Sequence, residues 1–119
     1  MKPFGFPRRQ RILKRNSFQK VQAEGRKVVT RYFVFLVRPN DLGWPRLGLT
    51  VSRKVGGAVV RNRVKRILRE AFRQERPFDG LGMDIVAIPR RELPIPAPYR
   101  LAADSLAELV RHIEGPRGI

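Results

Sequence analysis

A chain of 119 residues with 42% hydrophobic residues and a net charge of +16 is long enough for one domain, which we expect to span residues 1–119. It contains no cysteine, no apolar run of 18 residues and no apolar segment behind its basic N-terminus. The composition therefore excludes a disulfide framework, a thiolate metal site and a membrane-spanning helix, gives no sign of a secretory signal, and favours a cytoplasmic location.

The excess positive charge is confined to two blocks of the sequence. Residues 1–31 contain ten Lys or Arg and one acid, and residues 53–76 contain nine Lys or Arg and two acids. Residues 77–119 are nearly neutral, with five basic and six acidic side chains. Repulsion between like charges opposes compaction, so this asymmetry favours a polyanionic partner over a role in general solubility.

The first 11 residues are predicted to form an extended basic arm. They contain Pro3, Gly5 and Pro7 together with four cations, a composition that gives little structure in the absence of a partner. Phe4 and Phe6 could stack on nucleic-acid bases, although packing of the arm on the domain explains them equally well.

A short helix is predicted next, over residues 17–25. Ser17 offers an N-cap, and Gly25 offers a C-terminal stop. Phe18 and Gln22 lie one turn apart and share a helix face with Val21. Most aromatic residues on such a face belong to the core, so a packing role for Phe18 stands beside a binding role.

Three strands are predicted to follow. The first covers Lys27–Thr30, and the second, Tyr32–Val37, is apolar on both faces, as expected of a strand buried on both sides. The connection Pro39–Pro45 has the composition of a hairpin-like loop. In the third strand, large apolar residues alternate with small or polar ones, so something else can approach the face of Gly48 closely.

The longest predicted helix runs from Ala58 to Arg76. Its apolar residues recur at steps of three and four, which places them on one side. This stripe consists of Val60, Val64, Ile67, Leu68, Ala71 and Phe72. Lys65, Arg69 and Arg73 lie on the opposite side, with further cations beside them. For one basic helix alone, a solvated face and a nucleic-acid surface are about equally good interpretations.

Val55, Gly56 and Gly57 predict a tight turn into this helix. The spacing of a phosphate-binding nucleotide loop is missing. The N–H groups at the start of the helix could still bind a phosphate.

The last third of the chain supplies one buried strand, Asp84–Ile88, and one helix, Tyr99–Glu114, joined by a stiff proline-rich connection. The single histidine, His112, has no second histidine or cysteine nearby and suits a helix-end position better than a metal site. The elements therefore predict an α+β fold, a two-layer sandwich of one four-stranded sheet packed with helices.

The segment Ser52–Arg73, SRKVGGAVVRNRVKRILREAFR, closely resembles the signature of the bacterial ribonuclease P protein subunit. The core of the resemblance is Arg61-Asn62-Arg63. Upstream pieces agree, namely Arg11-Ile12-Leu13, Ser17-Phe18, Gly25-Arg26 and Arg46-Leu47-Gly48-Leu49. The resemblance covers most of residues 8–114.

This resemblance implies the order α-β-β-β-α-β-α, as in the second domain of ribosomal protein S5, with a left-handed crossover around the basic helix. It also implies a function in which the catalyst is an RNA subunit. The protein would bind that RNA and the 5′ leader of precursor tRNA, and Mg²⁺ would be held mainly by the RNA and the substrate. No catalytic residue, metal ligand, membrane contact or small-molecule ligand is expected in the protein.

The resemblance further implies roles by position. The residues expected to bind the RNA subunit are Arg61, Asn62, Arg63, Lys65, Arg66 and Arg69. Phe18 is expected to line the leader-binding cleft, with Arg53 and Lys54 at its basic edge. Gln22 stands where the family often has a second aromatic, so we expect Tyr32 or Phe35 to compensate by stacking.

Two other functions stay open at this point. Composition alone would favour a ribosomal or RNA-assembly protein, and an autonomous endonuclease is the second alternative. A metal-dependent nuclease usually needs clustered carboxylates, but six of the ten acids lie after residue 76, and Asp104 and Glu108 are best interpreted as solvated charges. With one histidine, a two-histidine acid–base mechanism is excluded.

Overall fold

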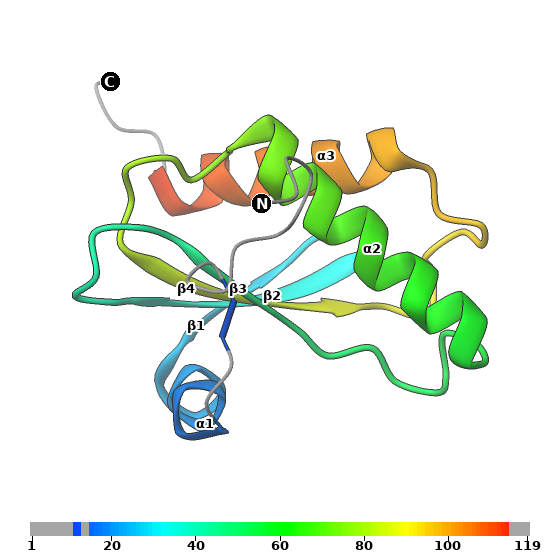
Figure 1. Cartoon of the computed structure of the whole chain (residues 1–119), viewed down its shortest axis with the longest axis horizontal. Helices are drawn as coiled ribbons and strands as arrows, with labels where there is room; N and C mark the ends of the chain where they lie inside the picture. Colours follow the sequence, from blue (N-terminus) through cyan, green and yellow to red (C-terminus); the bar gives the residue numbers. More distant parts are fainter. Residues whose placement is uncertain (1–10, 13–14, 115–119) are drawn as a thin grey trace, which may run out of the picture.

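The computed structural model describes residues 11–12 and 15–114. The predicted basic arm therefore lies outside the described residues, apart from Arg11. The elements are α1 (Arg15–Glu24), β1 (Arg26–Val29), β2 (Phe33–Pro39), β3 (Arg46–Leu49), α2 (Ala58–Glu75), β4 (Met83–Pro89) and α3 (Tyr99–Glu114). The predicted order and the α+β class are confirmed, and each element lies within a few residues of its predicted bounds (Figure 1).

The four strands form one mixed sheet in the order β1-β2-β4-β3. β2 is antiparallel to both of its neighbours, and β3 is parallel to β4. The expectation of a hairpin-like loop at Pro39–Pro45 is wrong, because β4 lies between the two strands that this segment joins. α2 makes the crossover between the parallel pair β3 and β4, and the left hand implied for it stays a prediction.

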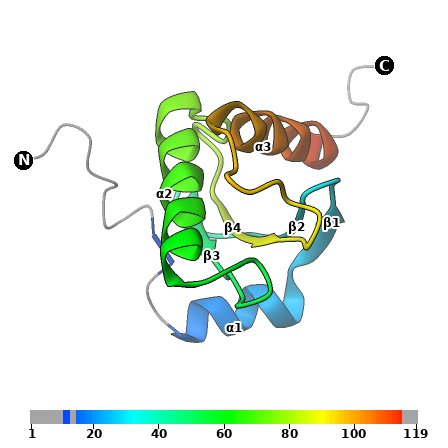
Figure 2. The same cartoon turned by 90° about the vertical axis from the view of Figure 1, so that its right-hand side faces the viewer.

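Helices cover both faces of the sheet. α2 and α3 lie on one face, and the shorter α1 lies on the other, so α1 adds a partial third layer to the predicted sandwich (Figures 1 and 2). The main core fills the space between the sheet and the helices α2 and α3. Its fully buried members include Phe33, Phe35, Leu68, Ile85 and Leu106.

A smaller core lies between α1 and the sheet. Its buried members are Ile12, Val21 and Val86, and the partly buried Phe18 and Leu36 pack against them. The apolar sequence of β2 has its explanation here, because Phe35 faces the main core while Leu36 faces α1.

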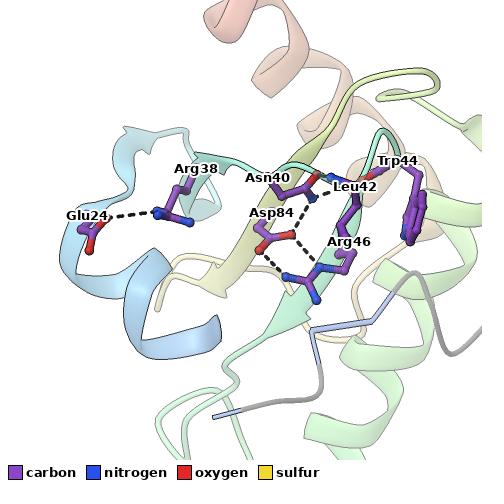
Figure 3. Close-up of polar contacts among 7 residues, drawn as sticks. All are labelled: Glu24, Arg38, Asn40, Leu42, Trp44, Arg46 and Asp84. Atoms are coloured by element: carbon purple, nitrogen blue, oxygen red, sulfur yellow. Dashed lines mark hydrogen bonds and ion pairs between the residues drawn. The ribbon is translucent and has the colours of Figure 1, made fainter. Parts of the chain in front are cut away.

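The buried carboxylate of Asp84 fixes the connection from β2 to β3, which crosses β4 near its first residue (Figure 3). Asp84, at the start of β4, accepts hydrogen bonds from Arg46 Nε at 2.8 Å and Arg46 Nη2 at 2.6 Å, and from Asn40 Nδ2 at 2.8 Å. The hydrogen bonds from Arg46 to Asp84 and the Asp84 charge raise the pKa of the Arg46 guanidinium. Asn40 and Arg46 flank the crossing segment, so Asp84 holds both of its ends and sets where β3 begins.

α2 begins after a glycine turn, as predicted. Gly56 has a φ of +158°, a conformation that side chains rarely adopt, and Gly57 is the N-cap without a side-chain hydrogen bond. The helix ends at Glu75 and is capped by Arg76, whose backbone is left-handed and whose N–H donates to the carbonyl of Phe72. Its buried stripe is Val64, Leu68, Ala71 and Phe72, so the opposite side is available for function.

Candidate nucleic-acid interface

A cleft of about 200 Å³ lies where α1, β3 and α2 meet. Phe18 of α1 lines it from one side, Gly48 and its neighbours in β3 from below, and Lys65 and Arg69 of α2 from the other side. Arg11 completes the cleft, because residues 11 and 12 run beside the free edge of β3, where the Ile12 N–H donates to the Leu47 carbonyl at 3.1 Å. The cleft thus combines an aromatic ring with three cations.

The electrostatics of this cleft favour an anion. Burial lowers the pKa of the Arg69 guanidinium, and the positive charge of Arg11 lowers it further. No acidic side chain lines the cleft. Repulsion between like charges is unfavourable in the free protein, and a phosphate between Arg11 and Arg69 would reduce it.

A second concave site lies on the outer side of α2. It has a volume of about 330 Å³ and is lined by Val59, Asn62, Arg63 and Arg66. Val59 is 73% exposed, which is unusual for a large apolar side chain and leaves it available to a partner. α2 therefore contributes to two concave sites, one toward α1 and β3 and one on its outer side.

Several cations of α2 form no ion pair with a carboxylate. Across residues 11–12 and 15–114, ion pairs with carboxylates involve Arg38 of β2, Arg46 of β3, Arg76 after α2, Arg90 after β4 and Arg100 of α3. Within the same ranges no such pair involves the α2 cations Arg61, Arg63, Lys65, Arg66 and Arg69. Arg61 is half-buried, and its Nε has no hydrogen-bond partner among the described residues. These α2 cations have the arrangement expected of a surface that binds phosphates.

Some of the predicted site residues lie outside both concave sites. Arg53 and Lys54 are exposed in the turn between β3 and α2, and Gln22 is exposed one helical turn beyond Phe18. None of the three lines the cleft. Their assignment to its edge stays a prediction.

The expectation that Tyr32 or Phe35 compensates for Gln22 is wrong. Phe35 is fully buried in the main core, on the face of the sheet opposite to α1. Tyr32 precedes β2, packs against the same core and lies beside α3, with the Arg31 guanidinium 5.1 Å from its ring centre. Neither ring can join Phe18 without disrupting the fold.

Arg11, Gly48 and Val59 are among the residues of these surfaces that were not predicted as site residues. The first two stand in motifs that resemble the family, and the alternation of β3 already placed Gly48 on a face open to close approach. Val59 had no signal in the sequence, because an apolar residue at the start of a helix is ordinarily assigned to the core.

The described residues offer no metal site of their own. No group of three or more His, Cys, Asp or Glu side chains among them could hold a metal ion. Mg²⁺ requires oxygen ligands, whereas the cleft is lined with cations, so the protein side chains there do not fit this ion. Across the described part of the chain, no helix is both long and apolar enough to cross a membrane.

Comparison with known proteins assigns this architecture to a family. The family model described as Ribonuclease P matches residues 6–114. The chain belongs to the ribonuclease P protein family. It is 39% identical over 113 residues to the ribonuclease P protein component of Thermotoga maritima, covering 92% of this chain and 97% of that protein. A ribonuclease P protein component from Syntrophus aciditrophicus is 42% identical over 88 residues, which is 74% of each chain.

Solved structures of the ribonuclease P family have the same fold. The protein from Thermotoga maritima matches with a TM-score of 0.78 at 37% identity, over 88% of this chain and 98% of that one. The protein from Staphylococcus aureus matches with a TM-score of 0.73 at 35% identity, over 87% and 94% of the two chains. The fold and the family signature therefore agree along nearly the whole chain.

Proposed function

We propose that this chain is the protein subunit of a ribonuclease P ribonucleoprotein that acts in the cytoplasm. It binds a catalytic RNA subunit and the 5′ leader of precursor tRNA, and so assists the cut that makes the mature 5′ end. The observation that carries this proposal is the pair of surfaces on α2, where Arg63, Lys65, Arg66 and Arg69 form no ion pair with a carboxylate among the described residues. Family membership supports the same conclusion.

The cleft suits a single-stranded leader. One base could stack on the Phe18 ring, which is partly exposed, while Lys65, Arg69 and Arg11 bind the adjacent phosphates. The resemblance assigned Lys65 and Arg69 to the RNA subunit, and we assign them to the leader instead because they line the cleft with Phe18. The space is sufficient for about one base, and Gly48 adds no side chain to it. Arg53 and Lys54 would extend the cationic path toward the start of α2.

The outer surface of α2 suits the RNA subunit. Asn62, Arg63 and Arg66 can bind phosphates and sugar hydroxyls, and the exposed Val59 can pack on a ribose. Arg61 lies on the other flank of α2 and could bind either RNA. One helix would then hold catalyst and substrate on neighbouring surfaces, which contributes to catalysis by orientation.

The protein in this proposal contributes binding and positioning rather than bond cleavage. Metal-assisted attack on the phosphodiester would be supplied by Mg²⁺ held by the RNA subunit and the substrate. The cationic side chains of the cleft would hold the leader and lower the concentration of free Mg²⁺ that the reaction needs. No residue of this chain is assigned a proton transfer or a metal ligand.

Reconstitution tests the proposed function. The protein is combined with a bacterial ribonuclease P RNA at low Mg²⁺, and removal of the leader is followed on precursor tRNA. We expect cleavage at the mature 5′ end that depends on both components. No stimulation would favour a ribosomal or RNA-assembly role, and cleavage without the RNA would favour an autonomous nuclease; either result would refute the proposal.

A further inference from the structure

The close contact between Phe18 and β3 depends on a glycine. A Cβ atom built on Gly48 would lie 2.7 Å from Phe18 Cζ and 3.0 Å from Phe18 Cε1, and 3.2 Å from Ile12 Cδ1. Carbon atoms in proteins essentially never approach at the first of these distances. The backbone of Gly48 is not in the left-handed region, so space rather than conformation makes glycine necessary here.

Any side chain at residue 48 would push the Phe18 ring away from β3, and the packing around the ring limits where it can go. Behind the ring lies the small core of Val21 and Val86, both fully buried. Protein cores are too densely packed to accept an aromatic ring without rearrangement. The ring can therefore move only outward, into the cleft of about 200 Å³ that Phe18 and Gly48 both line.

We propose that Gly48 is a positioning residue, which sets the depth of the Phe18 ring and so leaves room for one leader nucleotide to stack in the cleft. This inference rests on the proposed leader-binding function. The sequence of β3 favours it, since the neighbours Leu47 and Leu49 point into the main core and Gly48 alone faces the ring. The backbone of β3 at Gly48 is thus the surface against which the Phe18 ring packs.

The test is a double-mutant cycle with Gly48→Ala, Phe18→Leu and the combined variant in the reconstituted holoenzyme. Dissociation constants are measured for precursor tRNA and for mature tRNA at one salt and one Mg²⁺ concentration. Mature tRNA is the control, because it lacks the leader. We expect Gly48→Ala to weaken precursor binding about tenfold, within the range of one lost base stack, and to leave mature tRNA binding unchanged.

The combined variant separates positioning from a general packing role. Leucine lacks the ring atoms that would clash, so Phe18→Leu should relieve the overpacking created by Gly48→Ala. We expect the melting temperature to fall by about 4–12 °C in Gly48→Ala and to recover in the combined variant. Precursor affinity should not recover there, and should be no lower than in Phe18→Leu alone.

Three results would overturn the inference: equal losses for both RNAs, losses that multiply to about a hundredfold in the combined variant, or no rescue of stability by Phe18→Leu. If Gly48→Ala fails to fold, rescue of folding in the combined variant decides the question in the same way. A wild-type holoenzyme that binds precursor and mature tRNA equally would instead refute the proposed function. A wild-type preference for precursor tRNA that survives in Gly48→Ala would refute the positioning role alone.

Discussion

The buried pair of Arg46 and Asp84 allows a stability prediction with a matched control. In Arg46→Met the Asp84 carboxylate, whose side chain is 4% exposed, would lose two short hydrogen bonds and retain only that of Asn40. Breaking a buried pair on one side typically destabilises a protein by about 3–5 kcal/mol. With an unfolding entropy of about 2 cal/mol/K per residue, this loss corresponds to a fall in melting temperature of about 12–20 °C.

The control is Arg38→Met, the same substitution on the same side of the sheet (Figure 3). Arg38 binds Glu24 at 3.2 Å, but the Glu24 side chain is 59% exposed, so the loss should stay below about 1 kcal/mol. Thermal and urea unfolding followed by circular dichroism measure both variants. Equal stability losses in the two variants would show that Asp84 is solvated and that the pair does not hold the crossing segment.

Three further predictions concern RNA. Phe18→Ala should weaken binding of precursor tRNA by about 1–3 kcal/mol in the holoenzyme, with little change for mature tRNA, and should reduce stability by less than the 3–5 kcal/mol of a core phenylalanine. An equal loss of affinity for both RNAs in Phe18→Ala would contradict a role in leader binding. Gln22→Phe should widen the difference in affinity between precursor and mature tRNA if residue 22 faces the leader. Alanine at Arg61, Arg63 or Arg66 should weaken RNA-subunit binding by about 1–2 kcal/mol each with a native circular dichroism spectrum, whereas unfolding would mean that these arginines are structural. If roughly six phosphates are neutralised, the logarithm of the affinity for the RNA subunit should fall with the logarithm of salt concentration at a slope of about −4 to −5, and a nearly flat dependence would exclude a largely electrostatic interface.

Local sequence patterns were sufficient for the elements and for their buried faces. The apolar steps of α2 placed Val64, Leu68 and Phe72 in the core, and the structure buries all three. The alternation in β3 separated Leu47 from Gly48 correctly, because neighbouring side chains of a strand point to opposite faces. Periodicity decides which residues share a face, and this information is contained in a single segment.

Sequence patterns could not supply the pairing of the strands or the helix that covers each face. Phe35 and Leu36 are both apolar, and nothing within β2 shows that Phe35 faces the main core while Leu36 faces α1. Tyr32 was predicted to be part of this strand, but β2 begins only at Phe33, so the alternation of the strand does not extend to Tyr32. The position of β4 between β2 and β3 rests on pairing between segments far apart in the sequence, and Asp84 adds hydrogen bonds to Asn40 and Arg46 on both sides of the connection from β2 to β3.

The like charges along α2 affect how the free protein and the complex differ in stability. Lys65 lies four residues from both Arg61 and Arg69, so like charges face one another along the helix and destabilise it by a few tenths of a kcal/mol per pair. The buried stripe holds the helix against this repulsion, since its apolar residues pack on the sheet and on α3. A bound polyanion would remove the repulsion and add its own binding energy to the folded state. The same side chains that slightly weaken the isolated domain would thus make its folding and its RNA binding mutually reinforcing.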